Sequence, residues 1–414
     1  MRVYLRTFGC RANQYDSEAV RAMVEADGGT LVSAPEDADV AVFNSCAVTS
    51  HAVADLRQEV RRAARANASI RSVVMGCASA LPTETATLRA LPSVDALVAG
   101  AELSAVATAL GIRANPMATS RQSGARALLR IQDGCDEHCT FCATTLARGA
   151  HRSRPADVLV DEARALAVHH PEIVMTGVHI GGWGREHGTT LGSLVERLVR
   201  EVPHVRFRLT SIEATEVDER LAEMLIGAPG RVAPHLHAPL QSGSDRMLRR
   251  MGRHWYTASR YAAAVERLAA RAAVFALSAD VITGFPGEED SDHACTVALV
   301  RALPFTSLHV FPYSERAGTA AARLPEPVAP RVSRARAAAL RDLGAAKAAA
   351  HRGARVGGAA DVVVIRQGAA ARGLTEDYLD VALAAPAPHV ARFRGVLADR
   401  AGELTAEAPG VVSR

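Results

Sequence analysis

Two sets of three cysteines are the residues of this 414-residue chain whose types and spacing could carry chemistry. The first set, Cys135, Cys139 and Cys142, forms a C-x3-C-x2-C pattern in a loop directly after a predicted strand. Three thiolates do not complete a four-ligand structural zinc site, but they can hold three irons of a [4Fe–4S] cluster and leave the fourth iron open. A zinc site that also uses His138 is the alternative, and the spacing together with the strand context favours the cluster.

The second set, Cys10, Cys46 and Cys77, is scattered in sequence, but each cysteine directly follows a predicted strand. Because the strands of a parallel sheet point one way, their ends meet at the edge where open α/β sheets bind ligands. A single cysteine at a strand end is usually a buried small hydrophobic residue. Three at equivalent places predict a second three-cysteine cluster. Cys295 lies in a helical pattern, is expected to be a core thiol, and is given no role.

The elements that must position these cysteines fall into four predicted regions. Residues 1–114 alternate strand and helix and predict a parallel, Rossmann-like sheet with strands at 3–8, 40–44, 73–76 and 96–99. After a linker at 115–124, residues 125–330 hold six strand–helix units, which suit a partial TIM-like (β/α)6 barrel. Its strands are expected at 128–132, 173–178, 207–210, 236–240, 277–282 and 308–311. A basic helical connector (331–352) and a small β-barrel (353–414) complete the chain.

Composition limits the location and the partners. The chain has no apolar run of about 18 residues, and its N-terminus lacks the apolar region of a signal peptide. We therefore expect a cytoplasmic protein without membrane contact, whose thiols stay reduced. A monomer is the default expectation. The net charge is only +4 and Lys347 is the single lysine, so arginine supplies nearly all the positive charge. Arginine suits phosphate contacts, although bulk charge alone does not require nucleic acid.

Along essentially its whole length the chain resembles the methylthiotransferase family of radical S-adenosylmethionine (SAM) enzymes. Within the family, the run from Thr7 to Glu18 (TFGCRANQYDSE) is most similar to the MtaB type, which modifies N6-threonylcarbamoyladenosine (t6A) beside the tRNA anticodon. Further runs that fit are ARG at 147–149, RSRP at 152–155, GVHIG at 177–181, SIE at 211–213, HAPLQSGS at 237–244, DVITGFPGE at 280–288, VFPYS at 310–314 and GLTEDY at 373–378.

The resemblance implies an N-terminal methylthiotransferase domain with an auxiliary cluster, a radical SAM barrel and a C-terminal TRAM-like β-barrel. It implies two [4Fe–4S] clusters and SAM, one molecule of which is cleaved to a radical at the cluster of Cys135, Cys139 and Cys142. Ordinary acid–base catalysis does not replace the C2–H of adenine by sulfur, so a cofactor must supply that step. By family position, the SAM-binding residues are Gly177, Ser211, Glu213, Gln241 and Gly284. The alternative for the three polar residues is a capped strand end or a solvated turn, and for the two glycines it is tight packing.

The expected substrate is the anticodon stem-loop of tRNA, whose single-stranded loop lets the target base enter an active site. Candidate RNA-binding residues are Arg148, Arg152 and Arg154 or the basic stretch at 331–355. An electron donor such as flavodoxin or ferredoxin and a sulfur source are further partners. Alternative substrates are isopentenyladenosine in tRNA or a ribosomal-protein aspartate. A protein of another class, a non-catalytic tRNA-binding protein with structural zinc, would contain two zincs where the enzyme contains about eight irons.

Overall fold

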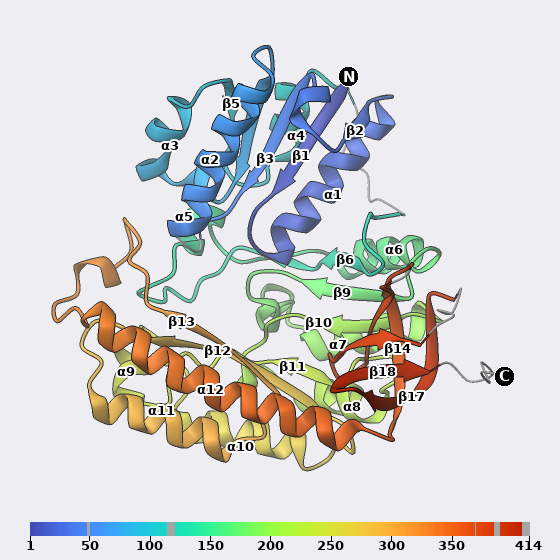
Figure 1. Ribbon diagram of the computed structural model, residues 1–414, viewed down its shortest axis with the longest axis vertical. Coiled ribbons are helices and arrows are strands. Elements are labelled where there is room, and N and C mark those ends of the chain that lie inside the picture. The colour runs from blue at the N-terminus through green and yellow to red at the C-terminus, as the bar shows by residue number, and fades with distance from the viewer. Residues whose placement is uncertain (48–49, 114–120, 369, 385–389, 408–414) are drawn as a thin grey trace.

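The N-terminal region is a five-stranded parallel sheet in the order β2-β1-β3-β4-β5. The structure, a computed structural model, describes residues 1–47, 50–113, 121–368, 370–384 and 390–407 (Figure 1). The sheet confirms the predicted Rossmann-like class, although β2 is a three-residue strand that the sequence pattern did not indicate. The elements are β1 (Arg2–Thr7), α1 (Arg11–Ala26), β2 (Thr30–Val32), β3 (Val40–Ser45), α2 (Ser50–Ala66), β4 (Arg71–Gly76), α3 (Pro82–Arg89), β5 (Val94–Leu97) and α4 (Leu103–Leu110).

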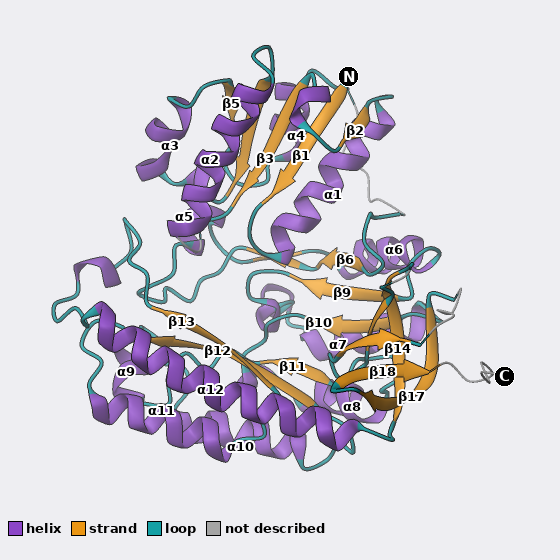
Figure 2. Ribbon diagram, viewed as in Figure 1, coloured by secondary structure: helices purple, strands orange, loops and turns teal. Residues whose placement is uncertain are grey.

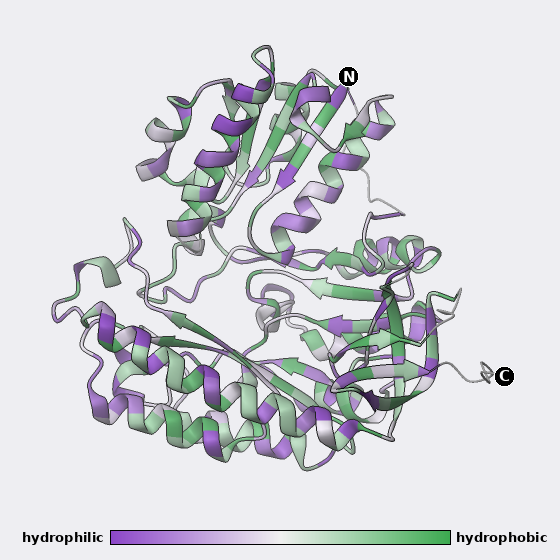
Figure 3. Ribbon diagram, viewed as in Figure 1, coloured by the Kyte–Doolittle hydropathy of each residue, from purple (hydrophilic) through white to green (hydrophobic). Residues whose placement is uncertain are grey.

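Helices cover both faces of this sheet because its strands are apolar on both sides. All six residues of β3 are buried. Val42 packs into a core on one face, with α1 and α4, whereas its neighbour Phe43 packs into a core on the other face, with α2. Near-continuous apolar strands of this kind are typical of parallel sheets buried on both faces, and the green strands of Figure 3 show the pattern.

The central region is a partial barrel of six parallel strands, as predicted. Two three-stranded sheets, β6-β9-β10 and β11-β12-β13, are joined by bridges between Phe207 and Val232 and between Ser211 and His237. Helices lie along the outer side of the strands (Figure 2). The elements are β6 (Ala127–Arg130), α6 (Ala156–Ala167), β9 (Glu172–Thr176), α7 (Leu191–Glu201), β10 (Arg206–Leu209), α8 (Glu219–Gly227), β11 (His235–His237), α9 (Asp245–Arg250), α10 (Ala258–Ala269), β12 (Ala276–Thr283), α11 (Asp290–Ala302) and β13 (Ser307–Pro312).

The two faces of the barrel strands differ in polarity. Along β12, Leu277, Ala279 and Val281 belong to the large core shared with the outer helices. Successive side chains of a strand alternate between faces, so Ser278 and Asp280 lie on the concave face. The interior of the partial barrel is therefore lined by polar side chains at this strand.

Between β6 and α6 the chain makes a hairpin of β7 (Gln132–Asp133) with β8 (Arg152–Ser153) and a five-residue helix, α5 (Thr144–Arg148). Cys135, Cys139 and Cys142 lie in the loop between β7 and α5. Helix α5 of this insertion lies beside the N-terminal region (Figure 1).

The C-terminal part consists of a 26-residue helix and a small closed barrel. Helix α12 (Pro330–Arg355) is longer than the predicted connector at each end and packs beside β13. The barrel has the order β14-β15-β16-β18-β17, from β14 (Ala359–Arg366), β15 (Arg372–Leu374), β16 (Asp380–Leu383), β17 (Arg392–Arg400) and β18 (Glu403–Glu407). The small β-barrel is confirmed, whereas the four-region division with its boundaries stays a prediction. Within the described ranges, no helix combines the length and the hydropathy needed to span a membrane.

Candidate active site

Cys10, Cys46 and Cys77 come together at the carboxyl edge of the N-terminal sheet. Cys10 caps the N-terminus of α1, Cys46 directly follows β3, and Cys77 directly follows β4. The Sγ atoms of Cys10 and Cys77 each lie 3.9 Å from Oδ1 of Asn13. Asn13 therefore lies between Cys10 and Cys77 at this edge of the sheet.

Gly9 lets the turn before α1 approach the second of these thiols. Its backbone has φ +98°, and a Cβ added there would lie 2.6 Å from Cβ and 2.7 Å from Sγ of Cys46. Only glycine fits both the left-handed conformation and this contact. The three thiols form a donor set suited to three irons of a cluster. Burial raises the pKa of the Cys77 thiol to about 11, so a bound metal would have to displace its proton.

Cys135, Cys139 and Cys142 form the second set, in a loop whose polar groups point at sulfur. The amide of Glu137 donates to Sγ of Cys135 and that of Thr144 to Sγ of Cys142, both at 3.4 Å. Arg253 donates from Nη1 to Sγ of Cys139 at 3.5 Å. Burial raises the pKa of the Cys139 thiol to about 12. Hydrogen bonds to ligand sulfurs are a feature of iron–sulfur sites, so this donor set fits a cluster as well.

Helix α5 connects the two cysteine sets. It begins two residues after Cys142 and ends at Arg148, whose Nη2 donates to Oδ1 of Asn13 at 2.6 Å. Ala143 and Ala147 pack in one apolar cluster with Cys77. One turn of helix thus connects the loop of Cys135, Cys139 and Cys142 to the residues that surround Cys77.

The three predicted RNA-binding arginines differ in burial, and one needs correction. The Arg148 side chain is 3% exposed and pairs with Asp16 and Asp133, both at 3.0 Å. A guanidinium buried among these acceptors is not placed to contact a phosphate. Arg154 is 26% exposed and pairs with Glu162, whereas Arg152 is 61% exposed and is the most accessible of the three.

The predicted SAM-binding residues Ser211, Glu213 and Gln241 follow the ends of β10 and β11. Glu213 is buried and forms an ion pair with Arg253, the same residue that donates to Cys139. Gln241 has φ +62° and accepts a hydrogen bond from the amide of Ile282. The carboxylate of Glu213 therefore lies one side chain away from the second cysteine set.

The two predicted SAM-binding glycines are explained by packing. A Cβ on Gly177 would lie 2.7 Å from the carbonyl oxygen of Gln132. A Cβ on Gly284, where φ is +71°, would overlap Ser333 of α12. The amide of Gly284 donates to Glu288 at 2.6 Å and is not free for a ligand. The alternative reading, tight packing, accounts for both positions.

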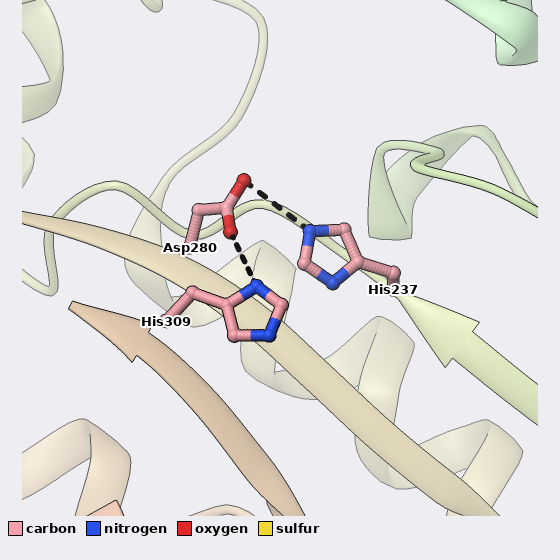
Figure 4. A group of neighbouring side chains, drawn as sticks. All are labelled: His237, Asp280 and His309. Carbon is pink, nitrogen blue, oxygen red and sulfur yellow. Dashed lines mark hydrogen bonds and ion pairs between the residues drawn. The ribbon is translucent and has the colours of Figure 1, made fainter. Parts of the chain in front are cut away.

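Two groups of ionisable side chains were missed by the sequence analysis. Nε2 of His179 lies 2.9 Å from both carboxylate oxygens of Glu216, and its Nδ1 lies 4.0 Å from Sγ of Cys135. Although burial opposes it, these two partners raise the pKa of His179 to about 10. The other group, His237, Asp280 and His309, lies on neighbouring barrel strands (Figure 4). Neither group has a local spacing signal, because its members are far apart in the chain.

Comparison with known proteins agrees with this arrangement. Residues 2–100 match the uncharacterized protein family UPF0004, and residues 129–300 match the radical SAM superfamily. The threonylcarbamoyladenosine tRNA methylthiotransferase MtaB of Bacillus subtilis (strain 168) is 34% identical over 351 residues, which cover 79% of this chain and 76% of that protein. The tRNA-2-methylthio-N(6)-dimethylallyladenosine synthase of Cereibacter sphaeroides (strain ATCC 17025 / ATH 2.4.3) is 34% identical over 346 residues, 78% of each chain.

The structural comparison shows a shared fold. The radical SAM methyltransferase TsrM from Kitasatospora setae, solved with tryptophan and a SAM analogue bound, matches with a TM-score of 0.56 and 16% identity. The match covers 75% of this chain and 72% of TsrM.

Proposed function

Because this chain belongs to the family of radical SAM methylthiotransferases, we propose that it converts t6A beside the tRNA anticodon to 2-methylthio-t6A. The observation that carries the proposal is the similarity to MtaB over more than three quarters of both chains. The convergence of two three-thiol sets through α5 supports it, because transfer of a methylthio group to an unactivated carbon needs a radical source next to a sulfur carrier.

SAM and one [4Fe–4S] cluster follow from family membership, and Cys135, Cys139 and Cys142 are the residues that would hold that cluster. Bound there, the cluster and SAM would supply a carbon radical able to act at C2 of adenine. We assign an auxiliary [4Fe–4S] cluster to Cys10, Cys46 and Cys77, where Asn13 and Arg148 provide polar contacts beside the thiols.

The remaining residues bind and orient. Glu213, held by Arg253, and the neighbouring Ser211 and Gln241 are proposed to contact the polar groups of SAM. Exposed Arg152 is proposed to contact an RNA phosphate, which would make binding sensitive to salt. A low-potential electron donor such as flavodoxin or ferredoxin and a sulfur source complete the reaction. A cytoplasmic location, where tRNA is found, fits this substrate.

Nucleoside mass spectrometry of total tRNA tests the proposal. In a strain that lacks the gene, 2-methylthio-t6A should disappear and t6A should accumulate. Re-expression of the wild-type chain should restore the modification, whereas a Cys139→Ser variant should not. Cys295→Ser is the matched control and should restore the modification fully, because Cys295 lies outside both sets. The prediction of a core thiol was wrong: Cys295 is exposed, on the solvent side of α11. Unchanged 2-methylthio-t6A in the deletion strain would refute the proposed substrate.

Methylthiolation of dimethylallyladenosine in tRNA is the second candidate, favoured by the 34% identity to the Cereibacter protein. The same experiment separates the two: loss of the 2-methylthio form of that nucleoside, with 2-methylthio-t6A intact, would assign the chain to it. If neither nucleoside changes, iron content decides between a protein substrate and a non-catalytic protein. About eight irons per chain indicate two clusters, and two zincs indicate a structural role.

A further inference from the structure

Three side chains on the concave face of the barrel form a hydrogen-bonded row across β11, β12 and β13. Asp280 is central: Oδ1 lies 3.2 Å from Nδ1 of His309, and Oδ2 lies 3.3 Å from Nε2 of His237 (Figure 4). The two imidazole rings are 5.3 Å apart. None of these residues belongs to a cysteine set or to the predicted SAM contacts, so the row has no role in the function proposed above.

The two histidines are held differently. Both ring nitrogens of His237 are engaged, because its Nδ1 also lies 2.8 Å from Oγ of Ser278. The His309 side chain is 55% exposed and uses only Nδ1 within the described structure. Hydrogen bonding to Asp280 raises the pKa of His309, which increases the imidazolium fraction near neutral pH. In its protonated form His309 has an Nε2–H that no hydrogen bond within the described residues uses.

Arginine charge lies near the histidine row. Arg11 directly follows Cys10, and its charge acts on the pKa of His309 after the larger effects of Asp280 and burial. The guanidinium groups of Arg11, Arg126 and Arg208 lie 5.9, 5.9 and 5.0 Å from the ring centre of Tyr378.

These arginines have little carboxylate to balance them. Glu172 forms an ion pair with Arg208, and its Oε1 lies 3.4 Å from Nη1 of Arg126. Arg11 donates to the hydroxyl of Tyr378 and has no carboxylate among its hydrogen-bond partners in the described residues. Asp280 is the carboxylate of the histidine row and Glu172 that of Arg208. Arg11 and protonated His309 are therefore the groups that can offer N–H donors to an anionic ligand between Cys10 and the row.

We propose that His309, oriented by Asp280 and His237, together with Arg11 recognises the carboxylate-bearing substituent on N6 of the target adenine. The inference rests on the proposed function and adds its specificity determinant. A threonylcarbamoyl group ends in a carboxylate and a hydroxyl, which can accept from these donors. A dimethylallyl group offers no acceptor, so its entry would strip water from Arg11 and His309 without replacing it. Sites built to hydrogen-bond a substrate reject analogues that lack the group.

Equilibrium binding of RNA to the anaerobically reconstituted holoenzyme tests this subsite apart from catalysis. Three synthetic anticodon stem-loops are compared by fluorescence anisotropy, with adenosine, t6A or dimethylallyladenosine at the target position. The wild-type protein should prefer the t6A loop. His309→Leu and the near-isosteric Asp280→Asn should weaken binding of the t6A loop about ten-fold, equivalent to about 1.4 kcal/mol. They should leave the adenosine loop unchanged, which also shows that the variants fold.

His169→Leu is the matched control, because His169 is exposed just beyond the end of α6, and it should bind all three loops like the wild type. A t6A preference that survives in both subsite variants would overturn the subsite and leave the proposed function standing. Equal weakening of all three loops would also overturn it, since the row would then act on the fold or on the RNA backbone. A wild-type preference for the dimethylallyl loop would overturn both the proposed substrate and the subsite.

Discussion

Replacement of Arg148 by methionine should uncouple the two cysteine sets. Methionine keeps the length and apolar stem of the side chain but removes the guanidinium that binds Asn13, Asp16 and Asp133. Removal of one partner from a buried ion pair costs about 3–5 kcal/mol. Asp16, whose side chain is fully buried, keeps Arg130 as a partner, so we expect the lower end, about 3 kcal/mol.

Two measurements follow from that magnitude. For a folding unit of 150–250 residues, 1 kcal/mol shifts the melting temperature by about 2–4 °C, so the transition should fall by about 6–12 °C. Iron after reconstitution should fall from about eight to about four per chain, because Arg148 supports the Asn13 and Cys77 side of the N-terminal set.

Arg152→Met is the matched control, four residues away. The Arg152 side chain is 61% exposed and lies 3.7 Å from Asp133, so its loss should change stability by less than about 0.5 kcal/mol. Iron content should stay at the wild-type value, while the salt dependence of RNA binding should lose about one phosphate contact. The reasoning would be refuted if Arg148→Met kept the melting temperature and iron of the wild type and showed the reduced salt slope instead.

Two further predictions concern buried contacts of the barrel. Glu172→Gln should destabilise the protein by about 3 kcal/mol, because it leaves the fully buried guanidinium of Arg208 without its carboxylate. Although burial alone would raise it, Arg208 and Arg206 hold the pKa of Glu172 well below its usual range. This stabilisation is therefore complete above the unfolded-state pKa of about 4.3 and is lost as the pH falls below it. The melting temperatures of wild type and variant should converge in acid. A difference in melting temperature that stays constant down to pH 3 would contradict this. Gly284→Ala should lower the melting temperature by several degrees, since its Cβ would overlap Ser333 at a positive φ. Gly227→Ala is the control and should not, because there is open space around that Cβ. Equal melting temperatures for the two variants would contradict the explanation of Gly284 by tight packing.

Much of the fold could be predicted from the sequence because its elements are long and strongly patterned. Helices such as α7 repeat their apolar residues with a clear period, and the short β-rich runs between them mark the barrel strands. The three-residue strands β2 and β15 were missed, whereas β11, also three residues long, was predicted because it overlaps the longer strand pattern at 236–240. The pairing that makes them strands comes from neighbours distant in sequence, such as Thr30 opposite Arg2.

The candidate site could be predicted where reactive residue types follow the ends of strands. It could not be predicted where the role of a residue depends on whether its side chain is buried. The grouping of Cys10, Cys46 and Cys77 follows from their common place after parallel strands. The burial of Arg148 does not, because it depends on Asp16 in another region of the chain. The row around Asp280 was also missed, because only the register between β11, β12 and β13 brings its histidines together.

The ring of Tyr378 makes the C-terminal barrel an integral part of the molecule. Arg11 contacts it from the start of α1, and Arg208 and the stacked His235 contact it from the central strands. The tyrosine itself comes from the segment between β15 and β16. Arg208 also donates to the carbonyl oxygens of Thr375 and Glu376. In a chain truncated before β14, Arg11 and Arg208 would lose the ring of Tyr378. Arg208 would also lose the two carbonyl oxygens that accept its hydrogen bonds. The small barrel thus supplies the aromatic and carbonyl partners of arginines from the other two regions.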